Sequence, residues 1–102
     1  MRSMMLLAAM IAMPATAGPS PERAAELERL VLQDCGSCHG LTLKGGLGPD
    51  IRPETISHYG TETLSSVILD GIPGTAMPPW RPLLSEAEVD WIVAYLLCGE
   101  VK

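Results

Sequence analysis

The chain has 102 residues, 47% of them hydrophobic and 19% charged, with a formal net charge of −5 at pH 7. This length fits one domain, and the acidic balance disfavours nucleic acids and anionic membrane surfaces, which both require a basic footprint in their protein partners. With two Trp, two Tyr and no Phe, the chain has few bulky side chains for a core, so a large apolar cofactor would supply the missing volume.

The first 17 residues are typical of a cleavable secretory signal peptide. A basic start at Arg2 precedes an unbroken apolar run, MMLLAAMIAM, over residues 4–13. This run is shorter than the about 20 apolar residues that cross a bilayer. It is followed by the small-x-small pattern ATA, which signal peptidase reads. We therefore expect cleavage after Ala17, a mature domain over residues 18–102, a periplasmic location and no membrane anchor after cleavage.

Three helices are predicted in the mature domain, and no strand-like alternation is present. The first spans residues 21–33, the second residues 61–69 and the third residues 85–98, where S-x-x-E forms a capping box. The expected N-terminal capping residues are Ser20, Thr61 and Ser85. The fold class predicted from this pattern is all-α.

Two irregular segments separate the predicted helices. Residues 41–51, LTLKGGLGPDI, carry too many glycines for a helix or a strand. Residues 72–84, IPGTAMPPWRPLL, contain four prolines, which exclude a regular helix or a central strand. Both segments are therefore expected to be loops.

The segment DCGSCHG contains Cys35, Cys38 and His39. A zinc site would need Cys98 and His58 as further ligands, but the paired cysteine spacing is not repeated. A thioredoxin-like dithiol expects a preceding strand, and a plain disulfide leaves the histidine without a role. Covalent haem c uses all three residues, because both thiols add to the porphyrin vinyl groups and the histidine becomes the proximal iron ligand. One covalent haem with its iron is therefore the preferred interpretation.

The opposite axial position of the iron needs a second ligand. Met77 is the only methionine outside the first 17 residues, and it lies in the Pro-rich segment GTAMPPW. Because the neighbouring prolines restrict the backbone, Met77 is the predicted axial ligand rather than a flexible core filler. His58, in the segment PETISHYG, which is expected to be a polar loop, is the rival candidate.

Together these segments resemble the small class I c-type cytochromes. DCGSCHG, GGLGP, PGTAMPPW and LSEAEVDWIVAYLL are most similar to the NirC-like group, the small monohaem cytochrome encoded beside cd1-type nitrite reductase. The resemblance covers nearly all of residues 18–102 and implies three to four helices wrapped around the haem. It also implies that the Pro49 carbonyl orients His39. Cys98 departs from the pattern of this family. Two roles are open for it: a buried thiol near the helix end, or a route to a covalent dimer.

The predicted His–Met ligation leaves no iron position for a substrate, so the expected function is single-electron transfer and not catalysis. The resemblance implies redox protein partners, with cd1-type nitrite reductase as the first candidate in denitrification. The alternative is an accessory role in maturing the special haem of that reductase, with electrons arriving from a haem-biosynthesis dehydrogenase. A haem-based ligand sensor is a third hypothesis, and it would require Met77 to dissociate readily.

The surface and assembly state are less constrained by the sequence. The acidic composition predicts a preference for positively charged docking faces and a salt-sensitive association. We expect a monomer, with a domain-swapped dimer as a minor state. The candidate partners of the haem propionates are Lys44, Arg52, Arg81 and the indole N–H of Trp80.

Overall fold

Helices joined by irregular loops make up the described part of the protein, residues 18–99 of the computed structural model, and no strand occurs in that range. The elements are α1 (Pro21–Leu30), the π-helix η1 (Val31–Cys35), α2 (Gly36–His39), α3 (Pro53–Ile56), α4 (Thr61–Asp70) and α5 (Glu86–Cys98). The all-α prediction is confirmed. The predicted signal peptide lies outside the described residues. None of the helices within 18–99 is long and apolar enough to cross a membrane.

The first predicted helix is longer and less regular than its sequence pattern indicates. The hydroxyl of Ser20 accepts a hydrogen bond from the Arg23 backbone N–H at 3.2 Å, as expected for its N-cap. Regular α-helix ends at Leu30, and a five-residue π-turn follows before the chain resumes α-helix as far as His39. A π-turn holds more residues than an α-turn, so it rotates the cysteine-bearing turn relative to the apolar stripe of α1.

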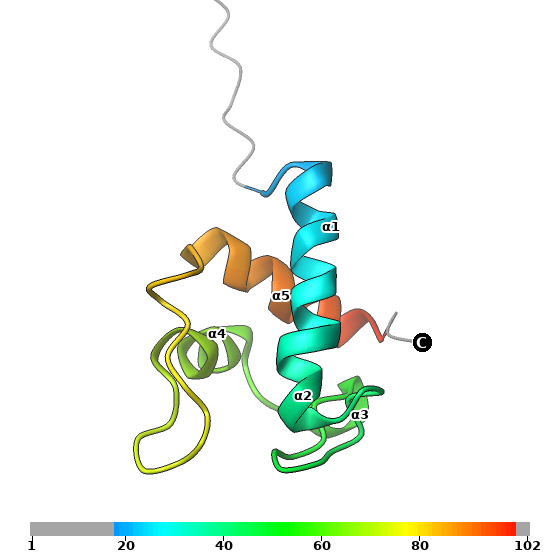
Figure 1. The fold of residues 1–102 in the computed structure, drawn as a ribbon, viewed down its shortest axis with the longest axis vertical. Helices are drawn as coiled ribbons and strands as arrows, with labels where there is room; N and C mark the ends of the chain where they lie inside the picture. Colours follow the sequence, from blue (N-terminus) through cyan, green and yellow to red (C-terminus); the bar gives the residue numbers. More distant parts are fainter. Residues whose placement is uncertain (1–17, 100–102) are drawn as a thin grey trace, which may run out of the picture.

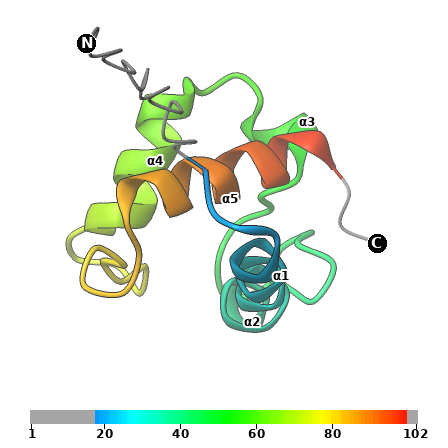
Figure 2. The ribbon, with the colours of Figure 1, turned by 90° about the horizontal axis from the view of Figure 1, so that it is seen from above.

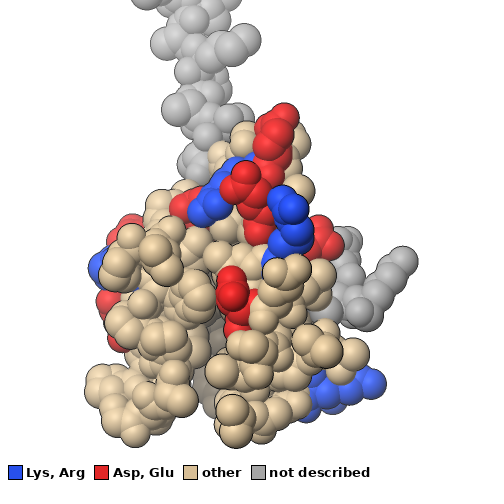
Figure 3. All heavy atoms as spheres, viewed as in Figure 1, with Lys and Arg blue, Asp and Glu red and all other residues tan. Residues whose placement is uncertain are grey.

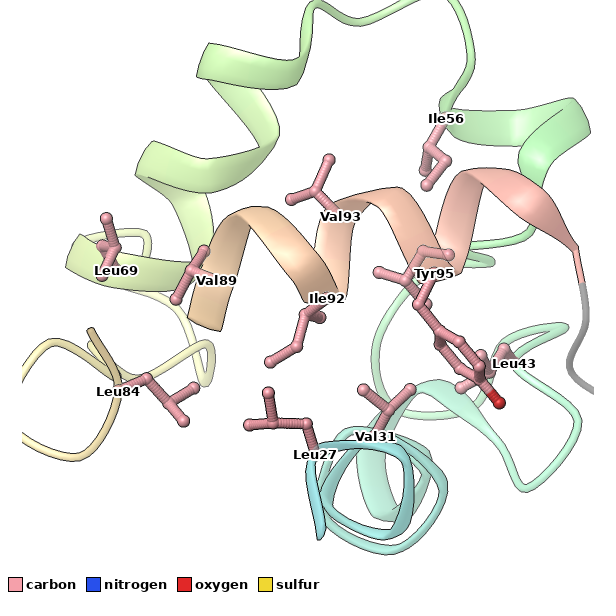
Figure 4. Close-up of a cluster of buried hydrophobic side chains, with 11 residues drawn as sticks. Leu27, Val31, Leu43, Ile56, Leu69, Leu84, Val89, Ile92, Val93 and Tyr95 are labelled. Atoms are coloured by element: carbon pink, nitrogen blue, oxygen red, sulfur yellow. The ribbon is translucent and has the colours of Figure 1, made fainter. Parts of the chain in front are cut away.

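Two local predictions in the middle of the chain are wrong. Thr61 is the first helical residue of α4, and the cap is Gly60, which contributes no side-chain hydrogen bond. The segment PETI, expected as loop, forms the single turn α3. Pro53 occupies the first helical position of α3, where its missing N–H costs nothing, and Ile56 is buried at 5% exposure. Burial of Ile56 near α5 therefore explains a turn that propensity alone does not predict (Figure 4).

The core forms where α5 crosses α1 and α4 (Figures 1 and 2). The capping box that begins α5 is confirmed: Ser85 Oγ accepts from the Glu88 N–H at 3.1 Å, and the Glu88 carboxylate accepts from the Ser85 N–H at 2.9 Å. Leu27 faces Ile92 across the crossing in Figure 4. The buried apolar side chains are Leu27, Val31, Leu43, Ile56, Leu69, Leu84, Val89, Ile92, Val93, Tyr95 and Leu96.

This packing brings two loops to one end of the molecule. The α1–η1–α2 rod runs downward in Figure 1 and delivers the cysteine-bearing turn to its lower end. The chain that leaves α4 descends on the other side as the yellow loop of residues 71–80. An ion pair between Arg23 of α1 and Glu88 of α5 joins the two helices that support this arrangement.

Candidate haem site

The motif cysteines and histidine occupy a single helical turn. Cys35 ends η1, and Cys38 and His39 lie in α2, all three half-buried. Positions three apart share a helix face, so the two sulfur atoms are placed to react with one ligand edge. Both cysteines are unpaired thiols. Burial, assisted by the neighbouring Asp34 carboxylate, raises the pKa of the Cys35 thiol to about 11, so it is protonated at neutral pH before any attachment.

The loop after α2 folds back onto the end of that helix. The Gly48 N–H donates to the Cys38 carbonyl at 2.7 Å, and the Gly45 N–H donates to the His39 carbonyl at 2.8 Å. Carbonyls at a helix C-terminus have no partner within the helix, so these bonds satisfy them. Leu43, buried at 1% exposure, anchors the same loop at a φ of +60° that is unusual for leucine.

This loop fixes the orientation and the proton of the His39 ring. His39 Nδ1 lies 2.7 Å from the Pro49 carbonyl oxygen. A carbonyl oxygen only accepts, so Nδ1 must carry the hydrogen and Nε2 keeps its lone pair for a metal. A Cβ atom at Gly48 would lie 2.8 Å from Cε1 and 2.9 Å from Nδ1 of the ring. Glycine is therefore required at this position for the chain to pass so close to the imidazole.

An ion pair that the sequence analysis missed holds the chain directly after Pro49. The Arg52 guanidinium donates to both Asp50 carboxylate oxygens, with Nη2 2.7 Å from Oδ2, and the Arg52 backbone N–H donates to Oδ1 at 2.8 Å. These bonds lower the pKa of Asp50 to about 2. The sequence contains a signal for this pair: Asp50 and Arg52 are two residues apart and lie between Pro49 and Pro53. Because each proline fixes its own φ angle, the backbone between them has little freedom to separate the two side chains.

The Met77 loop is fastened to α4 by its own backbone. The Trp80 N–H donates to the Ile68 carbonyl at 3.0 Å, and the Arg81 N–H donates to the Leu69 carbonyl at 3.0 Å. Met77 itself is half-buried. The segment expected to be loop from its prolines is therefore an ordered loop with no helix, packed against the end of α4.

A slot separates the two loops at the lower end of the molecule (Figure 3). The lobes on either side of it are mostly tan, whereas charged groups gather towards the end where α1 begins. The side chains packed beside the core but left partly exposed are Leu30, Cys35, Ile51, Leu64, Ile68, Trp80, Trp91 and Leu97. The turn of α2 that carries the motif lies on one side of this slot and the loop of residues 71–80 on the other (Figures 1 and 3). A mostly uncharged slot beside a CxxCH turn fits a covalently bound haem.

The rival interpretations find less support in the geometry. Over residues 18–99, no three His, Cys, Asp or Glu side chains come together as a metal-binding group, so the zinc hypothesis has no ligand set there. His58 is exposed, and its ring centroid lies 4.2 Å from that of Tyr59. Cys98 is an exposed thiol at the end of α5, so the buried alternative is wrong.

Two of the cations suggested as propionate partners are already engaged. Arg52 pairs with Asp50 and Glu54, and Arg81 pairs with Asp70 and Glu86. Lys44 has no salt bridge within the described part of the chain. Trp80 is partly buried against the core. Of the three cations, Lys44 is therefore the one left without a competing carboxylate there.

A protein-family model gives the class of the protein that this site indicates. The model described as "Cytochrome C oxidase, cbb3-type, subunit III" matches residues 22–96. The chain is a c-type cytochrome and belongs to that family of cytochrome domains. Its cofactor is accordingly haem c, bound covalently, with Cys35, Cys38 and His39 as the attachment motif.

Individual relatives place the chain more narrowly. It is 52% identical to cytochrome c55X of Paracoccus denitrificans over the full length of both chains. It is 51% identical to cytochrome c55X of Pseudomonas aeruginosa over 81% of this chain and 70% of that one. The solved structure of the c-type cytochrome NirC superposes with a TM-score of 0.79 at 49% identity, covering 81% of this chain and 98% of the other. The resemblance to the NirC-like group is therefore confirmed.

A larger relative contains a similar domain. Dihydro-heme d1 dehydrogenase of Pseudomonas aeruginosa is 41% identical over 68% of this chain but only 14% of its own length. The solved structure of dihydro-heme d1 dehydrogenase NirN superposes with a TM-score of 0.64 at 40% identity, covering 69% of this chain and 15% of that one. This chain thus resembles one small part of that protein.

The Asp50–Arg52 pair predicts a pH-dependent contribution to stability. Because the pKa of Asp50 falls from 3.8 to about 2 on folding, the paired carboxylate stabilises the native state above pH 3.8 and loses this effect as the pH drops towards about 2. We expect Asp50→Asn to lower the free energy of unfolding at pH 7, with a difference from the wild type that shrinks over that interval. Urea unfolding of the haem-loaded protein at several pH values measures it. Glu28→Gln, on an exposed face of α1, is the control, and a difference that stays constant with pH would contradict the assignment.

Proposed function

We propose that this cytochrome carries single electrons in the periplasm, with its haem iron held between His39 and Met77. The observation that carries the proposal is the hydrogen bond from His39 Nδ1 to the Pro49 carbonyl, which leaves the lone pair of Nε2 available to bind a metal. The loop of residues 71–80, which contains Met77, forms the lobe on the other side of the slot (Figures 1 and 3). Iron with one nitrogen and one thioether ligand supplies one-electron chemistry at a raised reduction potential.

The chain's own residues make this site rigid, which suits electron transfer. Gly48 and Gly45 tie the proximal loop to α2, while Trp80 and Arg81 tie the distal loop to α4. With both walls held by backbone hydrogen bonds, little has to move when the charge of the site changes by one. A sensor of small ligands would need the opposite, a distal wall that opens readily.

The ligand assignment predicts a clear spectroscopic result. We expect the oxidised wild type to show the weak red absorption band of a methionine sulfur on ferric haem, and the reduced form to be unchanged by carbon monoxide. Met77→Ala should lose this band and bind carbon monoxide, because the distal position is then open. His58→Ala is the matched control and should retain the band. A band that persists without Met77, or disappears without His58, would refute the assignment.

The periplasmic location is supported by the pattern of residues 1–17, with a basic start, an apolar run and a small-x-small end. In this proposal the segment directs export and is then removed, and haem attachment to Cys35 and Cys38 takes place on residues 18–102 after export. Expression in a bacterium with a haem-attachment system should give a periplasmic protein whose amino-terminal sequence starts at Gly18. A protein that retains Met1, or starts elsewhere, would contradict the cleavage site.

The partner we propose first is cd1-type nitrite reductase, on the strength of the similarity to NirC. A second candidate role is electron acceptance during maturation of that enzyme's special haem. The similarity to a domain of dihydro-heme d1 dehydrogenase favours it, because a separate cytochrome and a fused one of the same family would suit the same electron route.

Electron-transfer rates distinguish these two roles. We expect stopped-flow mixing of the reduced protein with purified cd1-type nitrite reductase to give faster transfer than an unrelated acidic cytochrome of similar potential. The mostly uncharged lobes beside the slot predict a weaker salt dependence than the acidic composition of the chain implies, since the Debye length is about 8 Å at physiological salt. Fast transfer with the dehydrogenase and none with the reductase would favour the maturation role instead.

A further inference from the structure

Gly71 joins α4 to the Met77 loop and lies against the far end of that loop. Its φ is +67°, and a Cβ atom placed on it would lie 2.6 Å from the Met77 carbonyl oxygen, 2.8 Å from the Pro78 carbonyl carbon and 2.9 Å from the Pro79 nitrogen. These neighbours are backbone atoms, which do not swing aside as the end of a flexible side chain does. Any other residue at position 71 would therefore push the methionine-bearing backbone away from α4.

The loop is closed on itself at the same place. The Ile72 N–H donates to the Met77 carbonyl at 3.2 Å. The Thr75 hydroxyl donates to the Ile72 carbonyl at 2.7 Å and accepts from the Met77 N–H at 3.3 Å. Both polar groups of the Met77 backbone are thus held by the first half of its own loop.

A third set of contacts fixes the exit of the loop. The backbone N–H groups of Trp80 and Arg81 bind the carbonyls of Ile68 and Leu69 near the end of α4, and the Arg81 guanidinium forms two hydrogen bonds with Asp70. The chain segments that enter and leave the Met77 loop therefore meet beside Gly71. The position of the Met77 backbone is set by how closely the two chain segments approach there.

We propose that Gly71 is a positioning residue for Met77: its bare Cα lets the Met77–Pro79 backbone pack against the end of α4, where the Met77 thioether would be held to bind the haem iron. This inference rests on the proposed ligation by Met77. It assigns to a residue outside the haem motif the task of keeping the distal position closed. When another residue replaces Gly71, the loop moves outward and external ligands reach the iron.

Gly74 offers a matched control within the same loop. Its φ is +79°, similar to that of Gly71, but a Cβ atom placed on it meets nothing within 4 Å. Alanine at either position carries the strain of a left-handed backbone. Only alanine at position 71 adds a steric conflict with the methionine backbone, so the pair separates backbone strain from positioning.

The test compares Gly71→Ala, Gly74→Ala and the wild type, each loaded with haem. Two readouts are used: the red absorption band of the oxidised form and the rate at which cyanide displaces the distal ligand. We expect Gly71→Ala to weaken the band and to accelerate cyanide binding at least about tenfold, a change that corresponds to about 1.4 kcal/mol. Gly74→Ala should keep the band and a cyanide rate close to that of the wild type, even if its melting temperature falls.

The outcomes separate this inference from the proposed function. A wild type that lacks the sulfur band refutes ligation by Met77, and the role of Gly71 falls with it. A wild type with the band and a Gly71→Ala variant with unchanged band and cyanide rate refutes the role of Gly71 alone, as do equal effects at positions 71 and 74. If Gly71→Ala yields no haem-loaded protein, Thr75→Val decides, because it removes both hydroxyl bonds of the closed loop. Faster cyanide binding in that variant supports the inference, and a wild-type rate overturns it.

Discussion

The arrangement of the site depends on how the backbone of residues 45–49 closes onto the end of α2. A helix that ends at His39 leaves carbonyl groups without partners, and the loop N–H groups of Gly45 and Gly48 provide them. The same closure brings the Pro49 carbonyl to His39 Nδ1. The same loop therefore ends the helix, is itself ordered by the helix end and orients the imidazole. A side chain at Gly48 would disturb all three.

The two walls of the slot are built by different means. The proximal wall is part of the α1–η1–α2 rod, and the burial of Leu27 and Val31 against α5 holds it in place. The distal wall has no helix of its own and depends on backbone hydrogen bonds to the end of α4. Because the contacts of α4 with α5 position that end, α5 serves as the common support that sets the separation of the walls.

Sequence patterns predicted most of the features whose cause is local, although the cap expected at Thr61 was wrong. The capping box of α5, the Ser20 cap and the glycine-rich loop follow from hydrogen bonds or φ angles within a few residues, and the structure agrees with each. The CxxCH motif was likewise recognisable as a haem-attachment site from the spacing of its residues alone. The π-turn η1 was not predictable in this way, because it depends on how the helix packs. Single-turn α3 depends on the burial of Ile56 beside α5, which no local pattern contains.

The site shows the same division between local and distant causes. Cys35, Cys38 and His39 were identifiable by residue type and spacing, because covalent attachment of haem c needs two thiols and an adjacent histidine. Met77 was proposed as the second iron ligand from its residue type and its Pro-rich setting. Gly71 carries no functional group, and the role proposed for it rests on three backbone atoms that approach within 3 Å of where its Cβ would be. Those atoms belong to residues six to eight positions further along the chain. Only the folded loop brings them together.

Charge illustrates the limit of composition as a guide to recognition. The net charge of −5 suggests an acidic protein, but each of Arg23, Arg52 and Arg81 pairs with two carboxylates. These carboxylates lie beside arginines, and on the face in Figure 3 the charged side chains lie mainly away from the slot. The loop beside the slot presents Leu41 and Leu47, at 77% and 93% exposure, in place of carboxylates. Charged side chains are therefore sparse beside the slot on this face, which favours shape and apolar contact over long-range attraction in defining the fit of a partner there.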